Sequence, residues 1–324
     1  VLLALSGAAA AAPEFSSEEA RMTARDFADK LEESYLDPEI GAKYAALLRE
    51  RASAGAYDMF DNPERFAEAA TVDVQSIYPD GHLKLRVDKQ REKTGESASA
   101  PPVDFKAFQE MRWMADGVVY AKWNAFLGDA DSMAAARSLL TAYSPAKAVI
   151  FDMRGHHGGG LDEQDVIFSA LFGKPTRLVK MRIREGKGRM MAGSFDAMRT
   201  MHRQPTANGV DVWEHWAEPA ADGAPLASAK VFVLTDGKTA SAGEHFVLAL
   251  KTTGRGVIVG EKTRGAGNFG GIEKIGSRFT AFIAVGQTID PATGKGWDAV
   301  GIEPDFHTPA DEALAKALSL IGQS

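Results

Sequence analysis

The sequence contains no cysteine among its 324 residues. This absence excludes disulfide bonds, thiolate metal sites and cysteine nucleophiles together, and it leaves covalent chemistry to serine or histidine. An excess of positive charge is also missing, because 44 acidic residues outnumber 37 basic ones and give a net charge of −7. Such a chain has no general electrostatic attraction to nucleic acid or to an anionic membrane, so we expect neither as a partner.

Long apolar stretches are missing as well. No run reaches the roughly 18 apolar residues that a membrane-spanning helix needs. The short apolar run over residues 1–12 ends in alanines before Pro13, which is typical of the end of a secretory signal peptide. We therefore interpret residues 1–15 as a signal-peptide remnant and expect export to the periplasm or the extracellular space. A disordered alanine-rich tail is the alternative.

Residues 16–80 have a helical pattern. They open with the helix-capping run Ser16-Ser17-Glu18-Glu19. Apolar residues then recur every four positions, at Phe27, Leu31 and Tyr35. We predict a small helical N-terminal domain over residues 16–80, followed by a half-buried strand at 83–87 and a charged loop at 88–102.

Residues 81–324 have the pattern of an α/β core. Buried-type strands alternate with helices, and this order calls for right-handed crossovers onto a largely parallel sheet. The expected elements are a strand at 118–123, a helix at 129–143, a strand at 147–153, a helix at 161–172, a strand at 230–235, a helix through 246–250 and a strand at 257–260. Residues 177–222 are rich in Met, Trp, Arg and His without clear periodicity, and we interpret them as an insertion or a β-rich flap near the active site.

Ser241 is the candidate nucleophile. It lies in the run Thr239-Ala240-Ser241-Ala242-Gly243-Glu244, after a buried strand and at the start of a helix. Free N–H groups and the helix dipole favour negative charge at such a place. A plain helix N-cap is the alternative role for this serine. The nucleophile elbow of α/β-hydrolases fits poorly, because it requires glycine where this chain has Thr239.

A serine nucleophile also needs oxyanion donors and a base. The loop over residues 154–160 follows a strand and ends in three glycines, whose amides can approach a ligand closely; a flexible turn is the alternative. For the base we choose His82, because it stands where a loop enters a strand; a surface or packing histidine is the alternative. His245, close to Ser241 on the same helix, is expected to point along the side of that helix.

Two further sequence patterns could indicate a nucleotide-binding loop or a metal site, but neither fits well. Residues 265–270 have the glycine spacing of a dinucleotide-binding loop, but the sequence after them predicts a strand rather than a helix. His156 and His157 are adjacent and have no partner at helical zinc spacing. We therefore predict neither a nucleotide cofactor nor a catalytic metal.

Five ordered blocks resemble the serine peptidase family of C-terminal processing proteases, the tricorn core and the interphotoreceptor retinoid-binding protein repeats. The blocks are residues 80–83, 152–159, 239–244, 260–267 and 297–305, within a match from about residue 18 to 310. The resemblance implies a ClpP/crotonase-like α/β core with a mixed, largely parallel sheet. It also implies a serine-type endopeptidase that cleaves peptides or unfolded proteins through an acyl-enzyme.

The resemblance carries roles onto residues of this chain. Ser241 is the implied nucleophile, and the implied oxyanion donors are the amides of Ala242 and Gly158, with Gly159 next to them. C-terminal processing proteases use a lysine 25 residues after the serine, where this chain has Ala266. A Ser–Lys dyad is therefore not expected.

The tricorn and retinoid-binding-protein branch of the family has no PDZ domain between the first block and the glycine loop. This branch places a histidine in the first block, which corresponds to His82, and tricorn-type enzymes have a glutamate where this chain has Asp298. We therefore expect a Ser–His enzyme. Gly81 stands where tricorn-type enzymes have serine, and His156 where the family usually has asparagine. The retinoid-binding repeats imply the alternative, which is a binder of a hydrophobic or peptide ligand in the same cleft.

Overall fold

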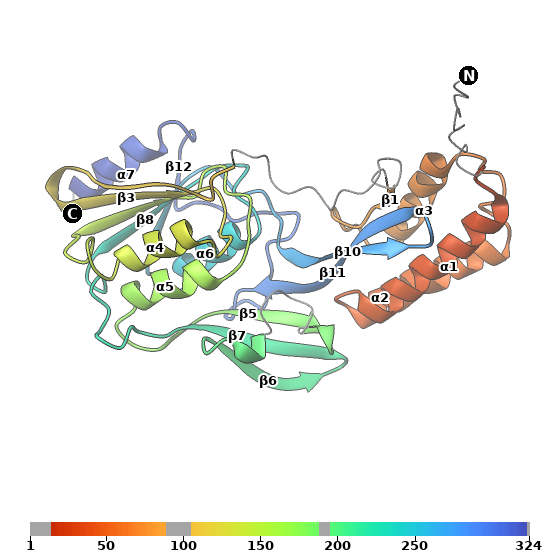
Figure 1. Cartoon of the computed structure of the whole chain (residues 1–324), viewed down its shortest axis with the longest axis horizontal. Helices are drawn as coiled ribbons and strands as arrows, with labels where there is room; N and C mark the ends of the chain where they lie inside the picture. The colour runs from red at the N-terminus through yellow and green to blue at the C-terminus, as the bar shows by residue number, and fades with distance from the viewer. Residues whose placement is uncertain (1–13, 89–104, 188–194, 323–324) are drawn as a thin grey trace, which may run out of the picture. The chain divides into compact units, whose positions relative to one another are not determined.

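The computed structural model describes residues 14–88, 105–187 and 195–322, and Figure 1 shows their helices and strands. Most of the predicted signal-peptide remnant and of the predicted loop at 88–102 lies outside these residues. The chain divides into two compact units: a first unit of Val1–Glu33, Glu39–Gly95 and Ile272–Ile283, and a second unit of the remaining segments. Within the described residues, no helix combines the length and apolarity needed to cross a bilayer.

The described residues of the first unit contain three helices and a short strand, together with parts of two longer strands. The helices and the short strand are α1 (Ser17–Ser34), α2 (Pro38–Ser53), α3 (Pro63–Ile77) and β1 (Leu85–Val87). α3 starts where the side chain of Asn62 accepts a hydrogen bond from the amide of Arg65, which is a standard N-cap. The buried ring of Phe66 lies 5.5 Å from Phe15 and 5.4 Å from Phe279, measured between ring centroids. This aromatic cluster joins the helices to β11 (Phe279–Ile289), which pairs with β1.

A six-stranded sheet forms the core of the second unit. Its strands run in the order β12-β9-β8-β4-β3-β2, and all neighbours are parallel except β2 and β3. The strands are β2 (Phe108–Trp113), β3 (Val118–Trp123), β4 (Ala148–Asp152), β8 (Lys230–Thr235), β9 (Val257–Gly260) and β12 (Phe306–His307). The predicted α/β fold with a mixed, largely parallel sheet is therefore confirmed.

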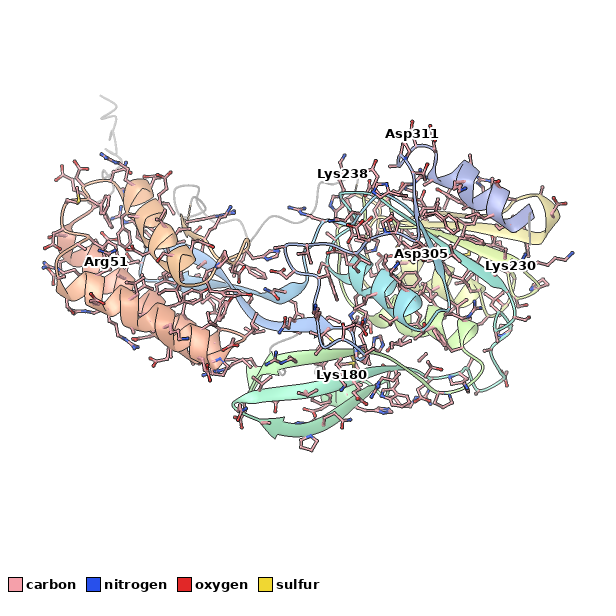
Figure 2. The ribbon with its side chains drawn as sticks, turned by 180° about the vertical axis from the view of Figure 1, so that it is seen from behind. Arg51, Lys180, Lys230, Lys238, Asp305 and Asp311 are labelled. Atoms are coloured by element: carbon pink, nitrogen blue, oxygen red, sulfur yellow. The ribbon has the colours of Figure 1, made fainter. Side chains whose placement is uncertain are left out.

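Helices cover both faces of this sheet, as Figure 1 shows. α4 (Ala130–Ser138), α5 (Asp162–Leu171) and α6 (Ala242–Thr252) pack on one face, and α7 (Ala313–Gly322) packs on the other. Successive residues of β4 face opposite sides, so that Val149 and Phe151 contact the first group while Ala148 and Ile150 contact α7. Asp305, labelled in Figure 2, ties α6 to the sheet, because its Oδ2 accepts from the amide of Ile258 at 2.9 Å and its Oδ1 pairs with Lys251.

The described residues of the segment over 177–222 form an antiparallel layer. It contains β5 (Thr176–Arg184), the short helix η3 (Phe195–Ala197), β6 (Met201–Ala207) and β7 (Val210–Ala217). β5 pairs with β7 and also with the C-terminal half of β11. The Gly265–Gly270 run continues into the strand β10 (Asn268–Ile275), which confirms that it does not open a helix as a dinucleotide-binding loop would.

Candidate active site

Ser241 occupies an unusual backbone conformation at the start of α6. Its φ is 53° and its ψ is −119°, a region that residues with a Cβ adopt rarely and at a cost of roughly 1–3 kcal/mol. Such a conformation persists only where neighbouring groups hold it. The strain therefore points to a turn that the surrounding structure fixes in place.

Glu244 supplies much of that restraint. Its side chain is fully buried, and its Oε2 accepts hydrogen bonds from the amides of Ser241 at 2.9 Å and Ala266 at 2.8 Å. Its Oε1 accepts from the hydroxyl of Thr263 at 2.6 Å and from the amide of Gly265 at 2.7 Å. The carboxylate thus ties the start of α6 to the loop that follows β9.

The loop that follows β4 is tied to the same turn from the other side. The hydroxyl of Thr239 donates to the carbonyl of Met153 at 2.8 Å, and the amide of Ala240 donates to the carbonyl of His156 at 2.9 Å. Both loops leave the carboxyl ends of adjacent parallel strands, where ligand sites of open α/β sheets are found. The β4 and β8 loops are therefore held together around Ser241.

Gly158 lies directly against the serine. A Cβ atom on Gly158 would lie 2.8 Å from Cβ of Ser241 and 3.2 Å from its Oγ, and the φ of Gly158 is +109°. Only glycine fits such a position without displacement. The amide of Gly158 donates to Nδ1 of its own neighbour His156 at 3.1 Å.

Two amides near the serine have no hydrogen-bond partner among the residues that the structure describes. They are the amide of Ala242, the first residue of α6, and the amide of Gly159. Gly159 has a φ of +129°, and a Cβ there would lie 1.9 Å from the carbonyl oxygen of Phe126. Both residues line the same cavity as Ser241, so both N–H groups are available to an anionic oxygen.

His156 lies beneath this arrangement and is completely buried. Burial lowers the pKa of its imidazole to about 3, with smaller contributions from His157 and Lys122. Its ring centroid lies 4.5 Å from that of Phe126, and a Cβ on Gly243 would come within 2.6 Å of its Nδ1. His156 is therefore a neutral packing residue of the glycine loop, not a solvated histidine.

A cavity of about 510 Å³ opens beside Ser241, a size typical of ligand sites. It lies entirely within the second unit. Its apolar walls combine the loop ends with the antiparallel layer and are formed mainly by Phe126, Leu127, Leu161, Met181, Phe195, Met198, Phe269 and Trp297. The segment at 177–222 therefore contributes directly to the site.

Comparison with known proteins agrees with this arrangement. A family model described as Peptidase family S41 matches residues 117–308. The chain belongs to peptidase family S41. This match confirms the family resemblance and includes four of the five sequence blocks, while the block at 80–83 lies before the matched residues.

Individual relatives of this S41 chain are distant. The chloroplastic carboxyl-terminal-processing peptidase 1 of Arabidopsis thaliana is 31% identical over 100 residues, a match that covers 31% of this chain and only 20% of that protein. Two solved structures share the fold. A lipoprotein from Streptococcus agalactiae has 14% identity and a TM-score of 0.58, over 98% of this chain and 99% of that one. The photosystem II D1 C-terminal processing protease has 15% identity and a TM-score of 0.57, over 92% and 97%.

The predicted site residues of this S41 chain are distributed over both units. Ser241, Ala242, Gly158 and Gly159 lie together in the second unit, as described above. Asp298 also belongs to the second unit, where its Oδ1 accepts from the amides of Gly267 and Asn268 at 3.0 and 3.1 Å and its Oδ2 accepts from the Asn268 side chain at 3.0 Å.

His82 belongs to the first unit. Its amide donates to Oδ1 of the buried Asp80 at 2.8 Å, and its Nδ1 lies 3.7 Å from the same oxygen. Its ring centroid lies 5.6 Å from that of Phe282. The backbone and the ring are thus fixed locally by a carboxylate and an aromatic ring, while the role of His82 as a base stays a prediction.

Sequence reasoning about His245 was wrong. The residue was expected to point along the side of α6, but it is 3% exposed and lines the cavity together with Ser241. Residues four positions apart on a helix lie on the same face, so a residue one turn after Ser241 can line the same cavity. This spacing was the signal in the sequence that could have predicted the position of His245.

Proposed function

We propose that this chain is a serine peptidase in which Ser241 is the nucleophile. The observation that carries the proposal is the strained Ser241 at the start of α6, which is open to an apolar cavity and lies beside the amides of Ala242 and Gly159, both without a hydrogen-bond partner among the described residues. Strained backbone clusters at functional sites, and a nucleophile beside preorganised N–H donors is the arrangement that acyl transfer requires.

The proposed reaction is hydrolysis of a peptide bond through an acyl-enzyme. Oγ of Ser241 attacks the carbonyl carbon while His82 accepts its proton, and Asp298 steadies the imidazole. The oxyanion of the tetrahedral intermediate is held by the amides of Ala242 and Gly159, with Gly158 as a third donor once His156 releases it. His82 then returns the proton to the leaving amine, and water hydrolyses the ester with the same base.

We propose a polypeptide substrate, in keeping with two of the relatives. The Arabidopsis relative is a carboxyl-terminal-processing peptidase, and one structural neighbour is a C-terminal processing protease of the photosystem II D1 protein. Their names support a peptide or protein as the molecule that this chain cleaves. Export to the periplasm or the extracellular space remains the prediction made from residues 1–15.

The size and apolar lining of the cavity favour one second candidate. At about 510 Å³, the cavity falls within the range of sites that bury a whole small ligand. A binder of a hydrophobic or peptide ligand would use the same walls and would not need an activated serine. The two candidates differ in the reactivity of Ser241.

A fluorophosphonate probe separates them. A peptidase should label at Ser241, and labelling should vanish in Ser241→Ala and fall by at least tenfold in His82→Gln. Ser144→Ala is the matched serine control, because Ser144 is half-buried and, among the described residues, its hydroxyl donates only to the carbonyl of Thr141 in its own turn. His202→Gln is the matched histidine control, because that side chain is 43% exposed on β6. Wild-type protein that never labels, yet binds an apolar ligand, would favour the binder.

A further inference from the structure

Three polar side chains from separate elements form a chain of hydrogen bonds behind the cavity. Oδ1 of Asp165 on α5 lies 2.7 Å from Nε2 of His215 on β7, and Nδ1 of His215 lies 2.8 Å from Nε2 of His245 on α6. Both imidazoles are buried, with exposures of 0% and 3%. The proposed catalytic steps use none of the three residues.

The carboxylate of Asp165 determines which ring nitrogen of His215 donates a hydrogen bond to it. Asp165 accepts hydrogen bonds at both oxygens, since its Oδ2 receives the hydroxyl of Thr200 at 2.7 Å. His215 therefore donates from Nε2 to this carboxylate. In the arrangement with one proton on each imidazole, His215 accepts at Nδ1, His245 donates from Nε2, and Nδ1 of His245 is left as a hydrogen-bond acceptor.

Neutrality of His245 follows from its surroundings. Burial, together with the adjacent His215, holds the pKa of His245 well below its ordinary value. Of its two ring nitrogens, only Nε2 has a hydrogen-bond partner among the described parts of the chain. His245 lines the cavity, whose walls are otherwise largely apolar. Of the three hydrogen-bonded residues Asp165, His215 and His245, it is therefore His245 that offers an acceptor to a ligand in the cavity.

The other walls define what can reach that acceptor. Met181, Phe195, Met198, Phe269 and Trp297 surround a space that a large planar side chain can fill. Ser241 lines the same space one helical turn before His245. A ligand anchored at the serine would therefore place its side chain among these apolar groups and its tip near the imidazole.

We propose that the cavity receives the substrate side chain next to the scissile bond, and that His245 selects an aromatic side chain ending in a hydrogen-bond donor, as in tyrosine. The assignment to a substrate side chain rests on the function proposed above, whereas the recognition chemistry does not. Asp165 and His215 are positioning residues, because they act only by fixing the tautomer of His245. A carboxylate-bearing side chain is rejected, since it would face a lone pair in an apolar cavity.

Binding of two small amides tests this selectivity without any catalytic turnover. N-acetyl-tyrosinamide and N-acetyl-phenylalaninamide differ by one hydroxyl, and a site that hydrogen-bonds a hydroxyl discriminates against the analogue that lacks it. In the full chain carrying Ser241→Ala, we expect the tyrosine amide to bind at least tenfold more tightly. Adding His245→Phe should bring the two affinities within about twofold, whereas adding His202→Gln should leave the tenfold preference unchanged.

A spectroscopic measurement covers the case in which His245→Phe does not fold. In ¹⁵N-histidine-labelled Ser241→Ala protein, long-range ¹H–¹⁵N spectra should show His245 protonated at Nε2 and unprotonated at Nδ1. The tyrosine amide should shift the Nδ1 resonance, and the phenylalanine amide should not. Equal affinity for the two amides, failure of both to bind, or a proton on Nδ1 would each overturn the proposal.

Failure of the proposed His245 selectivity can be told apart from failure of the proposed peptidase activity. A protein that prefers the tyrosine amide but never labels with a fluorophosphonate retains the selective cavity and loses the enzyme. A protein that labels at Ser241 but binds both amides equally retains the enzyme and loses the role of His245. The two experiments therefore report on separate claims.

Discussion

Oε2 of Glu244 accepts a hydrogen bond from the amide of Ser241 at a distance of 2.9 Å. The same carboxylate takes three more hydrogen bonds from residues 263–266. A buried carboxylate is costly unless its oxygens are satisfied, and here four donors satisfy them. The strained serine turn and the loop after β9 thus depend on one another through a single side chain.

Replacing this carboxylate by an amide should destabilise the second unit. In Glu244→Gln, an NH₂ group would replace one acceptor oxygen and face N–H and O–H donors. We expect a loss of about 3 kcal/mol in the free energy of unfolding, because hydrogen bonds to buried charged groups are worth about 1.5–3 kcal/mol each. Urea unfolding followed by tryptophan fluorescence measures it, since all five tryptophans lie in the second unit.

The matched control is Glu303→Gln. Glu303 carries an exposed side chain that pairs with Lys262, and such surface pairs contribute at most about 1 kcal/mol. Equal losses in the two variants would mean that the Glu244 network does not hold the turn.

Adding one methyl group to the glycine loop should remove reactivity at the serine. In Gly158→Ala, the new Cβ would lie 2.8 Å from Cβ of Ser241, so the loop must move away and the oxyanion donors move with it. We expect fluorophosphonate labelling to fall by about 10²-fold, as when one oxyanion donor is lost. The rate of labelling measures the effect.

Gly155→Ala separates the steric contact from backbone strain. Gly155 also has a positive φ, +72°, but a Cβ there would meet nothing within 4 Å. This variant should lose about 1 kcal/mol of stability and keep its labelling rate. If both variants label normally, the close approach of Gly158 to Ser241 has no functional role.

The sequence patterns predicted the core elements because each depends on local spacing. Buried strands at β4 and β8, each followed by a glycine-containing loop and a helix, were readable from runs of apolar residues. The Glu244 contact was also readable in principle, because Ser241 and Glu244 have the spacing of a capping box. β2 was not predicted, since its residues are mostly exposed on an edge strand and show no buried face.

The Asp165–His215–His245 chain could not have been predicted in the same way. Its members lie on α5, β7 and α6, separated by 50 and 30 positions. Asp165 is one of several acidic residues in the first turn of α5, where a role in capping is the ordinary interpretation. The hydrogen bonds exist only because packing brings three unrelated faces together.

Acid should destabilise the second unit through His156. The pKa of the imidazole is about 3 in the folded protein, against an ordinary value of 6.5. Between pH 6.5 and pH 3 the unfolded chain therefore binds a proton at this histidine, whereas the folded chain leaves it unprotonated. Stability is therefore fully present above about pH 6.5 and is lost as the pH falls towards 3. By proton linkage, this histidine lowers the free energy of unfolding by about 2 kcal/mol between pH 7 and pH 5.

The His156→Asn variant should lack this part of the pH dependence of stability. Urea unfolding at both pH values, followed by tryptophan fluorescence, should show a loss about 2 kcal/mol smaller in the variant than in the wild type. His245, whose pKa is also lowered, continues to contribute in both proteins. Parallel pH dependences would mean that His156 is not held neutral in the folded state.

The position of Ala266 allows a test of which base serves Ser241. Ala266 lies 25 residues after Ser241 and lines the same cavity. A lysine at this position could take the serine proton in place of a histidine. In a His82→Ala background, we therefore expect Ala266→Lys to raise fluorophosphonate labelling by at least tenfold.

The pH profile identifies the rescuing group. Only the neutral amine accepts a proton, so the rescued rate should rise with pH as the lysine deprotonates. Ala266→Met has a similar length without an amine and should give no rescue. Rescue by methionine would show that cavity filling, not proton transfer, raises the rate, and labelling that survives unchanged in His82→Ala alone would remove His82 as the base of Ser241.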